Sequence, residues 1–137
     1  MSLVVDSSLA LSWYFRDEQT EARLKILDQV VEGGATVTPI WFYEVAKSLQ
    51  VAVRRKRVGA AFRDASLADL ATLNIGVDPD CDAHAWSATV QLADRHGLTV
   101  YDASYLELAQ RRRLELATLD VALAKAARAE HLAVTGD

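Results

Sequence analysis

The amino-acid sequence predicts an α/β protein of three layers, α/β/α, in which helices cover both faces of a central parallel sheet of four or five strands. Two observations support this prediction. Short apolar runs alternate along the chain with longer segments of helical periodicity. The 137 residues are 51% hydrophobic and 25% charged, which provides one core of ordinary domain size. We therefore expect residues 1–137 to fold as a single domain.

The expected strands are short apolar runs, each of which ends at a polar residue or a turn. They are Leu3–Val5, Thr36–Thr38, Ile75–Val77 and Leu116–Leu119, with Leu132–Val134 as the candidate for a fifth. Apolar runs of this kind are typical of strands that are buried between two layers of helices. Because helical segments separate them, consecutive strands are expected to be parallel.

Helical patterns fill the segments between the strands. Ser7 and Ser8 are expected to cap a short packed helix, and Pro39 suits the first turn of a later one. The pair Gly33-Gly34 stops the helix that precedes the second strand. The longer helical segments are expected over residues 17–32, 39–57, 60–73, 82–96, 102–113 and 120–130.

Four acidic residues stand where strands end or helices begin. Asp6 follows the first expected strand and Asp120 the fourth, while Glu44 and Asp102 lie in early turns of helices. The carboxyl ends of parallel strands and the helices that follow them meet at one edge of a sheet, so the four carboxylates could meet in one cleft. Each acid taken alone also has an ordinary explanation, since Asp is a favoured N-cap and Glu44 could be a solvated helix position.

A cluster of four carboxylates needs a counterion. Two unit charges about 4 Å apart repel by about 4 kcal/mol at an effective dielectric constant of about 20. Mg²⁺ or Mn²⁺ removes this repulsion, because hard cations prefer oxygen ligands, and Mg²⁺ usually keeps several waters. Activation of one such water beside a neutralised phosphate suits the hydrolysis of phosphodiester bonds.

Four segments of the chain resemble the PIN-domain ribonucleases, specifically the VapC-like toxins of type II toxin–antitoxin systems. The segment from Val4 to Tyr14 is similar to the family's first strand, first acid and first helix. Pro39 with Glu44-Val45-Ala46 is similar to its second acidic segment. The segments Tyr101–Leu106 and Ala117–Asp120 are similar to its two later acidic motifs. All four occur in order, so the resemblance implies a PIN-like fold over the whole chain.

The resemblance implies that Asp6, Glu44, Asp102 and Asp120 form an acidic quartet that holds Mg²⁺ or Mn²⁺ for RNA cleavage. Asp6 and Asp102 are the expected direct ligands, whereas Glu44 and Asp120 could bind directly, act through water or hold a second ion. Thr118 is expected to support the site by hydrogen bonding, although it could equally be a half-buried strand residue. The expected activity is that of a metal-dependent endoribonuclease.

Lys47 departs from the family pattern, because family members often carry Asn three residues after the helix acid. Its ammonium could pair with Glu44, contact an RNA phosphate or point outward. A catalytically silent PIN-like module that binds RNA or protein is therefore the alternative function. A phospho-accepting receiver or a phosphatase on a similar sheet is disfavoured, because Ser7-Ser8 follows Asp6 where such sites cluster further acids.

The resemblance also implies a cognate antitoxin and a homodimer as partners, besides RNA as the substrate. The aromatic triplets 13–15 and 41–43 could supply a dimer contact or an antitoxin groove, although core packing explains most of their rings. The basic runs 54–57 and 111–113 fall at helix ends, where cations favour the helix dipole, and RNA binding is the alternative.

Charge and composition narrow the remaining classes. With 15 Lys and Arg against 19 Asp and Glu, the net charge of −4 disfavours a protein that coats nucleic acid. No apolar stretch approaches the roughly 20 residues of a membrane-spanning helix, and the first residues lack a basic leader. Cys81 is the single cysteine, so no intrachain disulfide can form. We expect a cytoplasmic protein that does not contact membranes.

Overall fold

The computed structural model describes residues 2–137, which contain a five-stranded sheet. Neighbouring strands are all parallel, in the order β3-β2-β1-β4-β5. The strands are β1 (Leu3–Val5), β2 (Ala35–Val37), β3 (Ile75–Val77), β4 (Leu116–Ala117) and β5 (Val134–Thr135). The predicted parallel sheet is therefore confirmed, and its fifth strand forms. The largest difference in strand ends is at β4, which stops two residues early.

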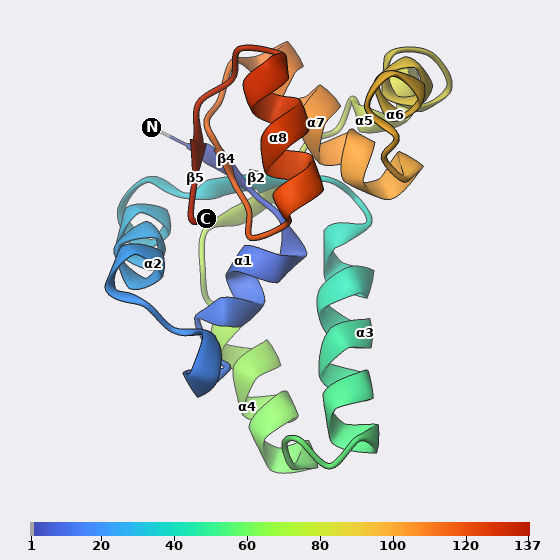
Figure 1. Ribbon diagram of the computed structural model, residues 1–137. Helices are drawn as coiled ribbons and strands as arrows, with labels where there is room; N and C mark the ends of the chain where they lie inside the picture. Colours follow the sequence, from blue (N-terminus) through green and yellow to red (C-terminus); the bar gives the residue numbers. More distant parts are fainter. Residues whose placement is uncertain (1) are drawn as a thin grey trace.

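Helices form a layer on each side of this sheet (Figure 1). The chain steps from β1 to β2 to β3 in one direction and then returns across β1 to β4 and β5. Right-handed crossovers place the helices of the two directions on opposite faces. The first layer holds α1 (Ser7–Ser12), the 3₁₀-helix η1 (Arg16–Glu18), α2 (Glu21–Gly33), α3 (Trp41–Arg54) and α4 (Ala60–Leu70). The second holds α5 (Cys81–His84), the π-helix η2 (Ala85–Thr89), α6 (Val90–His96), α7 (Val100–Arg112) and α8 (Val121–Ala129).

The point where the strand order reverses lies between β1 and β4. The chain leaves β1 toward β2, whereas β4 leads to β5 on the other side. Crevices at the carboxyl edge of such a switch point are the usual ligand sites of open α/β sheets. Asp6 directly follows β1, and Asp120 lies three residues beyond the end of β4. The topology therefore places two of the four predicted acids at this edge.

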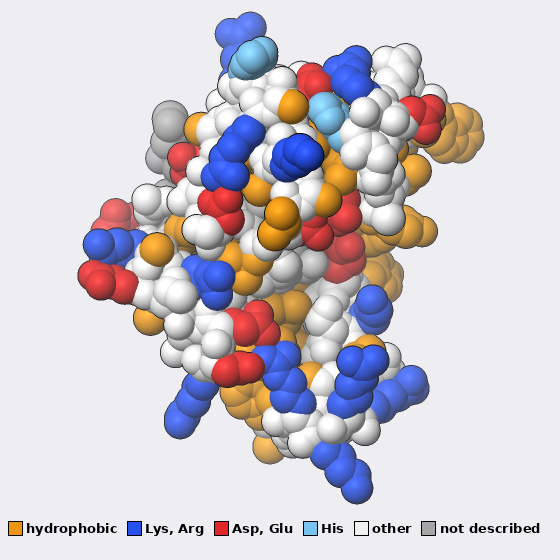
Figure 2. Space-filling model, in the orientation of Figure 1, with side chains coloured by type: hydrophobic (Ala, Val, Ile, Leu, Met, Phe, Trp, Pro, Cys, Tyr) orange, Lys and Arg blue, Asp and Glu red, His pale blue; other side chains and the backbone are white. Residues whose placement is uncertain are grey.

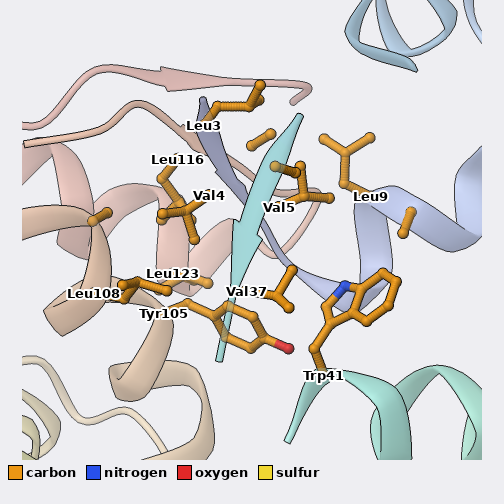
Figure 3. Packing of buried hydrophobic residues seen from close by; sticks show 14 of the residues in the cluster. Leu3, Val4, Val5, Leu9, Val37, Trp41, Tyr105, Leu108, Leu116 and Leu123 are labelled. Carbon is orange, nitrogen blue, oxygen red and sulfur yellow. The ribbon is translucent and has the colours of Figure 1, made fainter. Parts of the chain in front are cut away.

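The core is formed by apolar side chains on both faces of the central strands. Val4 points toward Leu108 and Leu123 of the second layer, whereas Val5 points toward Leu9 of the first (Figure 3). All five side chains are fully buried. Burial of such a side chain stabilises the fold by about 1.5–3 kcal/mol relative to leaving it exposed. The strand alternation thus fixes β1 in register between the two helical layers.

Three predicted helix starts are wrong in detail. Asp6, and not Ser7 or Ser8, caps α1, because its carboxylate accepts a hydrogen bond from the Leu9 backbone N–H. Thr99, and not Asp102, caps α7, so Asp102 is the third residue of that helix. Pro39 lies in the turn before α3 and outside its first turn. In each case the chain uses a capping position one to three residues away from the expected one.

Two predicted helices are divided. The segment 17–32 splits into η1 and α2 because Thr20 adopts an extended backbone and caps α2 through its hydroxyl. The segment 82–96 is divided into α5, η2 and α6 by the π-helical turn. The Trp86 side chain on that turn is 96% exposed. Gly97, with φ +64°, ends α6 as expected from the sequence.

The basic runs at the helix ends make ion pairs within the chain. Arg111 bonds to Asp78 and Glu107, which are buried, and Arg112 also reaches Asp78. Arg57 bonds to acids of the η1 segment and lies 3.9 Å above the ring of Phe15. These pairs occupy the charges of three of the basic residues. In the part of the chain described, no helix is both long and apolar enough to cross a membrane.

Candidate active site

Asp6 is the most deeply placed of the four acids, with only 4% of its surface exposed. Its Oδ1 accepts hydrogen bonds from the Leu9 backbone N–H at 3.0 Å and the Ser8 hydroxyl at 2.7 Å. Its Oδ2 accepts a hydrogen bond from the hydroxyl of Thr118, which is fully buried. The capping position at the start of α1 therefore fixes the carboxylate in one orientation.

Thr118 and Ser8 join the end of β1 to the segment that follows β4. Thr118 Oγ1 accepts a hydrogen bond from the Asp120 backbone N–H at 3.0 Å while its own proton goes to Asp6. Ser8 Oγ accepts a hydrogen bond from the Leu119 backbone N–H at 3.1 Å while its proton also goes to Asp6. The two hydroxyls thus hold Asp6 and the backbone of Asp120 in a fixed relation.

Asp120 and Asp102 both lie at the beginning of a helix and are half-buried. Asp120 caps α8, and its Oδ1 accepts a hydrogen bond from the Leu123 backbone N–H at 2.8 Å. Asp102 is in the first turn of α7, where its backbone N–H donates to Thr99 Oγ1 at 3.1 Å. The side-chain oxygens of Asp102 therefore remain available for a ligand.

Glu44 approaches the same region from the first turn of α3. Its Oε1 accepts a hydrogen bond from the hydroxyl of Tyr105, a buried residue one turn after Asp102 on α7. This bond ties α3 of the first layer to α7 of the second. Lys47, one turn further along α3, is exposed, and its positive charge lowers the pKa of Glu44.

The charges of the four acids act on one another. Burial raises the pKa of Asp6 to about 6, against the hydrogen bonds from Thr118, Leu9 and Ser8, and the charge of Asp102 raises it further. Burial also raises the pKa of Asp102, and the charge of Asp120 adds to this effect. Asp102 is therefore the acid whose charge couples to those of its neighbours.

Glu44 belongs to the same electrostatic group. Burial raises its pKa above the ordinary value, the Tyr105 hydrogen bond opposes this, and the charge of Asp102 raises the pKa further. Figure 2 shows a group of acidic side chains where the start of α3 meets α7 and α8. The structure thus brings acids from four separate segments to one edge of the sheet, where they repel one another.

The donor set fits a hard divalent cation held mainly through water. Within residues 2–137, no three His, Cys, Asp or Glu side chains are arranged to hold a metal ion together. Mg²⁺ does not require such a cage, because it usually keeps several waters and is bound through one or two carboxylates and a substrate phosphate. Mutually repelling carboxylates with half-buried oxygens match that mode of binding.

Several residues of this region carry no obvious signal in the sequence. Ser8 and Thr99 act as hydrogen-bond partners of the acidic segments, and Tyr105 links two helices. The position of Ser8, two residues after a capping Asp, is a usable signal. Nothing in the local sequence relates Tyr105 to Glu44, because the two are 61 residues apart and meet only in the folded chain.

Comparison with known proteins decides the family. A model of the PIN domain matches residues 3–129. The chain belongs to the PIN-domain family. A relative of this PIN-domain protein, ribonuclease VapC3 of Pyrobaculum aerophilum, is 31% identical over 125 residues, which cover 91% of this chain and 94% of the relative. The chain is thus a homologue of the VapC ribonuclease toxins, and the resemblance seen in the sequence is confirmed.

Solved structures share the PIN fold of this chain. PAE2754 from Pyrobaculum aerophilum has a TM-score of 0.67 at 24% identity, covering 92% of this chain and 87% of that one. FitAcB from Neisseria gonorrhoeae has a TM-score of 0.66 at 18% identity, with coverages of 99% and 97%. VapBC2 from Rickettsia felis, bound to a DNA fragment from the promoter, has a TM-score of 0.66 at 11% identity, with coverages of 98% and 97%. The predicted fold class is confirmed.

Proposed function

We propose that this VapC-type ribonuclease is a Mg²⁺- or Mn²⁺-dependent endoribonuclease in which Asp6, Glu44, Asp102 and Asp120 hold the metal and the scissile phosphate. The observation that supports this assignment is the electrostatic coupling of Asp102 to the other three acids. Carboxylates that repel one another bind a cation more strongly than isolated ones. When bound, the ion would neutralise the phosphate and activate water for attack.

The residues of the chain divide the remaining work. Asp6, locked by three hydrogen bonds, presents a fixed carboxylate at the floor of the site. Asp102 and Asp120 are half-buried and therefore face the substrate side. Thr118 orients Asp6 and the backbone of Asp120, and Tyr105 orients Glu44. Fixed donors of this kind remove the cost of reorganising the site during the reaction.

A cleavage assay with purified protein tests the proposal. Asp102→Asn removes one charge without changing side-chain size, and we expect RNA cleavage with Mn²⁺ to fall by at least about 100-fold, since metal-borne stabilisation is worth several kcal/mol. Calorimetry should show weaker Mn²⁺ binding in the same variant. Asp28→Asn on the exposed side of α2 is the matched control and should cleave like the wild type.

Two results would contradict the assignment. Full cleavage by Asp102→Asn would show that the acids are not the catalytic group. RNA binding by the wild type that is unchanged by EDTA, with no cleavage at any metal concentration, would favour the alternative of a silent RNA- or protein-binding module.

We also propose a cognate antitoxin and a homodimer as the protein partners. The structures of FitAcB and VapBC2, which share the fold, support an antitoxin partner for a toxin of this type. Expression of the wild type should arrest growth of a host cell, and Asp102→Asn should not. Coexpression of the antitoxin should relieve the arrest, and light scattering of the purified toxin at several concentrations measures its oligomeric state.

A further inference from the structure

A cavity of about 210 Å³ lies beside the acids, between the start of α3, the α5–η2 segment and the first turns of α7. Its walls include Pro39, Ile40, Ala85, Val100 and Tyr101. Pockets for drug-sized ligands usually measure about 300–1,000 Å³. This cavity is smaller and lined largely by apolar groups, so it suits a single flat ring system.

Two of its lining residues connect the cavity directly to the acidic site. Tyr101 immediately precedes Asp102 in the first turn of α7. Thr38 directly follows β2 and neighbours the hydroxyl of Tyr105, which donates its proton to Glu44. A ligand group in the cavity would therefore lie within one nucleotide of a phosphate that is held by the acids.

The Thr38 hydroxyl is a polar group without a partner. The residue is fully buried, and its Oγ1 has no hydrogen-bond partner among the residues of the chain that the structure describes. A buried polar group left unpaired costs about 1–3 kcal/mol. A hydrogen-bonding group of a ligand in the cavity would remove this cost, and an apolar ligand would not.

Tyr101 supplies an aromatic surface at the mouth of the same cavity. Its side chain is 58% exposed, which is unusual for a ring that lines an apolar cavity. Its backbone is held in place by the Ser104 hydroxyl, which donates to the Tyr101 carbonyl at 2.6 Å. Single-stranded RNA is commonly recognised by stacking its unpaired bases on such rings.

We propose that this cavity binds one nucleobase of single-stranded RNA next to the scissile phosphate, stacked on Tyr101 and hydrogen-bonded to the hydroxyl of Thr38. The subsite rests on the proposed ribonuclease function and makes Tyr101 and Thr38 determinants of cleavage specificity. A second copy of the chain is the competing occupant, because Val100 and the nearby Trp86 are also exposed. An apolar protein contact would leave the Thr38 hydroxyl unpaired, so a base with polar edges fits the cavity better.

Cleavage of a random-sequence RNA pool by purified protein tests the subsite. Sequencing the cut ends gives the base preference at each position around the cleavage site. Tyr101→Ala should lower kcat/KM for the preferred sequence by about 5- to 140-fold and flatten the preference at one position only. Tyr101→Phe should keep both, because its ring still stacks. Thr38→Val should change which base is preferred at that same position.

Trp86→Ala is the matched control, since it removes an exposed ring on the neighbouring η2 turn that does not line the cavity. It should leave the preference profile unchanged. An unchanged profile in both Tyr101→Ala and Thr38→Val would overturn the base subsite. A drop from dimer to monomer in Tyr101→Ala and Trp86→Ala alike, with the profile intact, would assign the surface to a second copy and would also overturn it.

Binding of short RNA oligonucleotides in EDTA separates this proposal from the proposed function. If the wild type cleaves no RNA, the nuclease proposal fails, and fluorescence anisotropy still reports whether Tyr101→Ala weakens binding by the expected 5- to 140-fold. If the wild type cleaves and binds RNA but Tyr101→Ala does both equally well and with the same base preference, only the subsite fails.

Discussion

Substitution of Asp6 by Asn should stabilise the metal-free protein at alkaline pH while it abolishes cleavage. The pKa of Asp6 is raised from 3.8 to about 6, mainly by burial. Because the folded pKa lies above the unfolded one, the stability of the protonated form is fully present below about pH 4 and is lost as pH rises through about 6. The shift of about 2 units corresponds to about 3 kcal/mol at pH 8.

The net gain from Asp6→Asn is smaller than this figure. Asn keeps an oxygen for the Leu9 N–H and the Ser8 hydroxyl, but its NH₂ group cannot accept the hydrogen bond from Thr118. Loss of that bond costs about 1 kcal/mol, which leaves a gain of about 2 kcal/mol at pH 8. For a chain of this size, the melting temperature should rise by about 6–8 °C.

Calorimetry in EDTA at pH 5 and pH 8 measures this effect. The gain should be present at pH 8 and much reduced at pH 5, where wild-type Asp6 is largely protonated. Added Mn²⁺ should raise the melting temperature of the wild type more than that of Asp6→Asn. Asp28→Asn, at an exposed position of α2, should show no pH-dependent difference. Equal destabilisation of Asp6→Asn at both pH values would refute the reasoning, because burial of the charge would then not limit stability.

Three further substitutions test other parts of the structure. Thr118→Val removes the hydrogen bonds to two of the acids and should lower Mn²⁺ affinity and cleavage by about 10- to 100-fold, while Thr118→Ser should restore them. Asp78→Asn breaks a buried ion pair with arginines of α7 and should cost about 3–5 kcal/mol in urea unfolding, whereas the exposed Asp82→Asn should cost little. Glu130, whose pKa the His96 hydrogen bond lowers to about 2, stabilises the fold above about pH 4.5. Glu130→Gln should cost about 1–3 kcal/mol at pH 7, measured by urea unfolding, and the difference from wild type should vanish as pH falls toward 2.

The sheet could be predicted because its strands carry a strong local signal. Leu3–Val5 and Ile75–Val77 match the observed strands residue for residue, since each apolar run is bounded by polar or turn-forming residues. The end of β4 could not be predicted, because Thr118 and Leu119 are as suited to a strand as the residues before them. There the hydrogen bonds from Thr118 to Asp6 and from the Leu119 N–H to Ser8 draw the chain out of the sheet.

The candidate site could be predicted only in part from the sequence. The positions of Asp6 and Asp120 follow from the rule that ligands bind at the carboxyl ends of parallel strands. The approach of Glu44 to Asp102 depends on how α3 packs near α7, and the bond that joins these helices involves Tyr105, 61 residues after Glu44. No local pattern encodes such a contact. The resemblance to a known family supplied what periodicity could not.

The placement of all four acids at helix N-termini explains how the chain can fold with its carboxylates together. Asp6 and Asp120 cap their helices, and Glu44 and Asp102 lie in first turns. An acid at a helix N-terminus gains about 0.3–1 kcal/mol, so the four helices contribute about 1–4 kcal/mol together. One pair of carboxylates about 4 Å apart already repels by about 4 kcal/mol at an effective dielectric constant of about 20. The helix dipoles therefore offset only part of the repulsion among four acids, and the remainder favours binding of a divalent cation at this edge of the sheet.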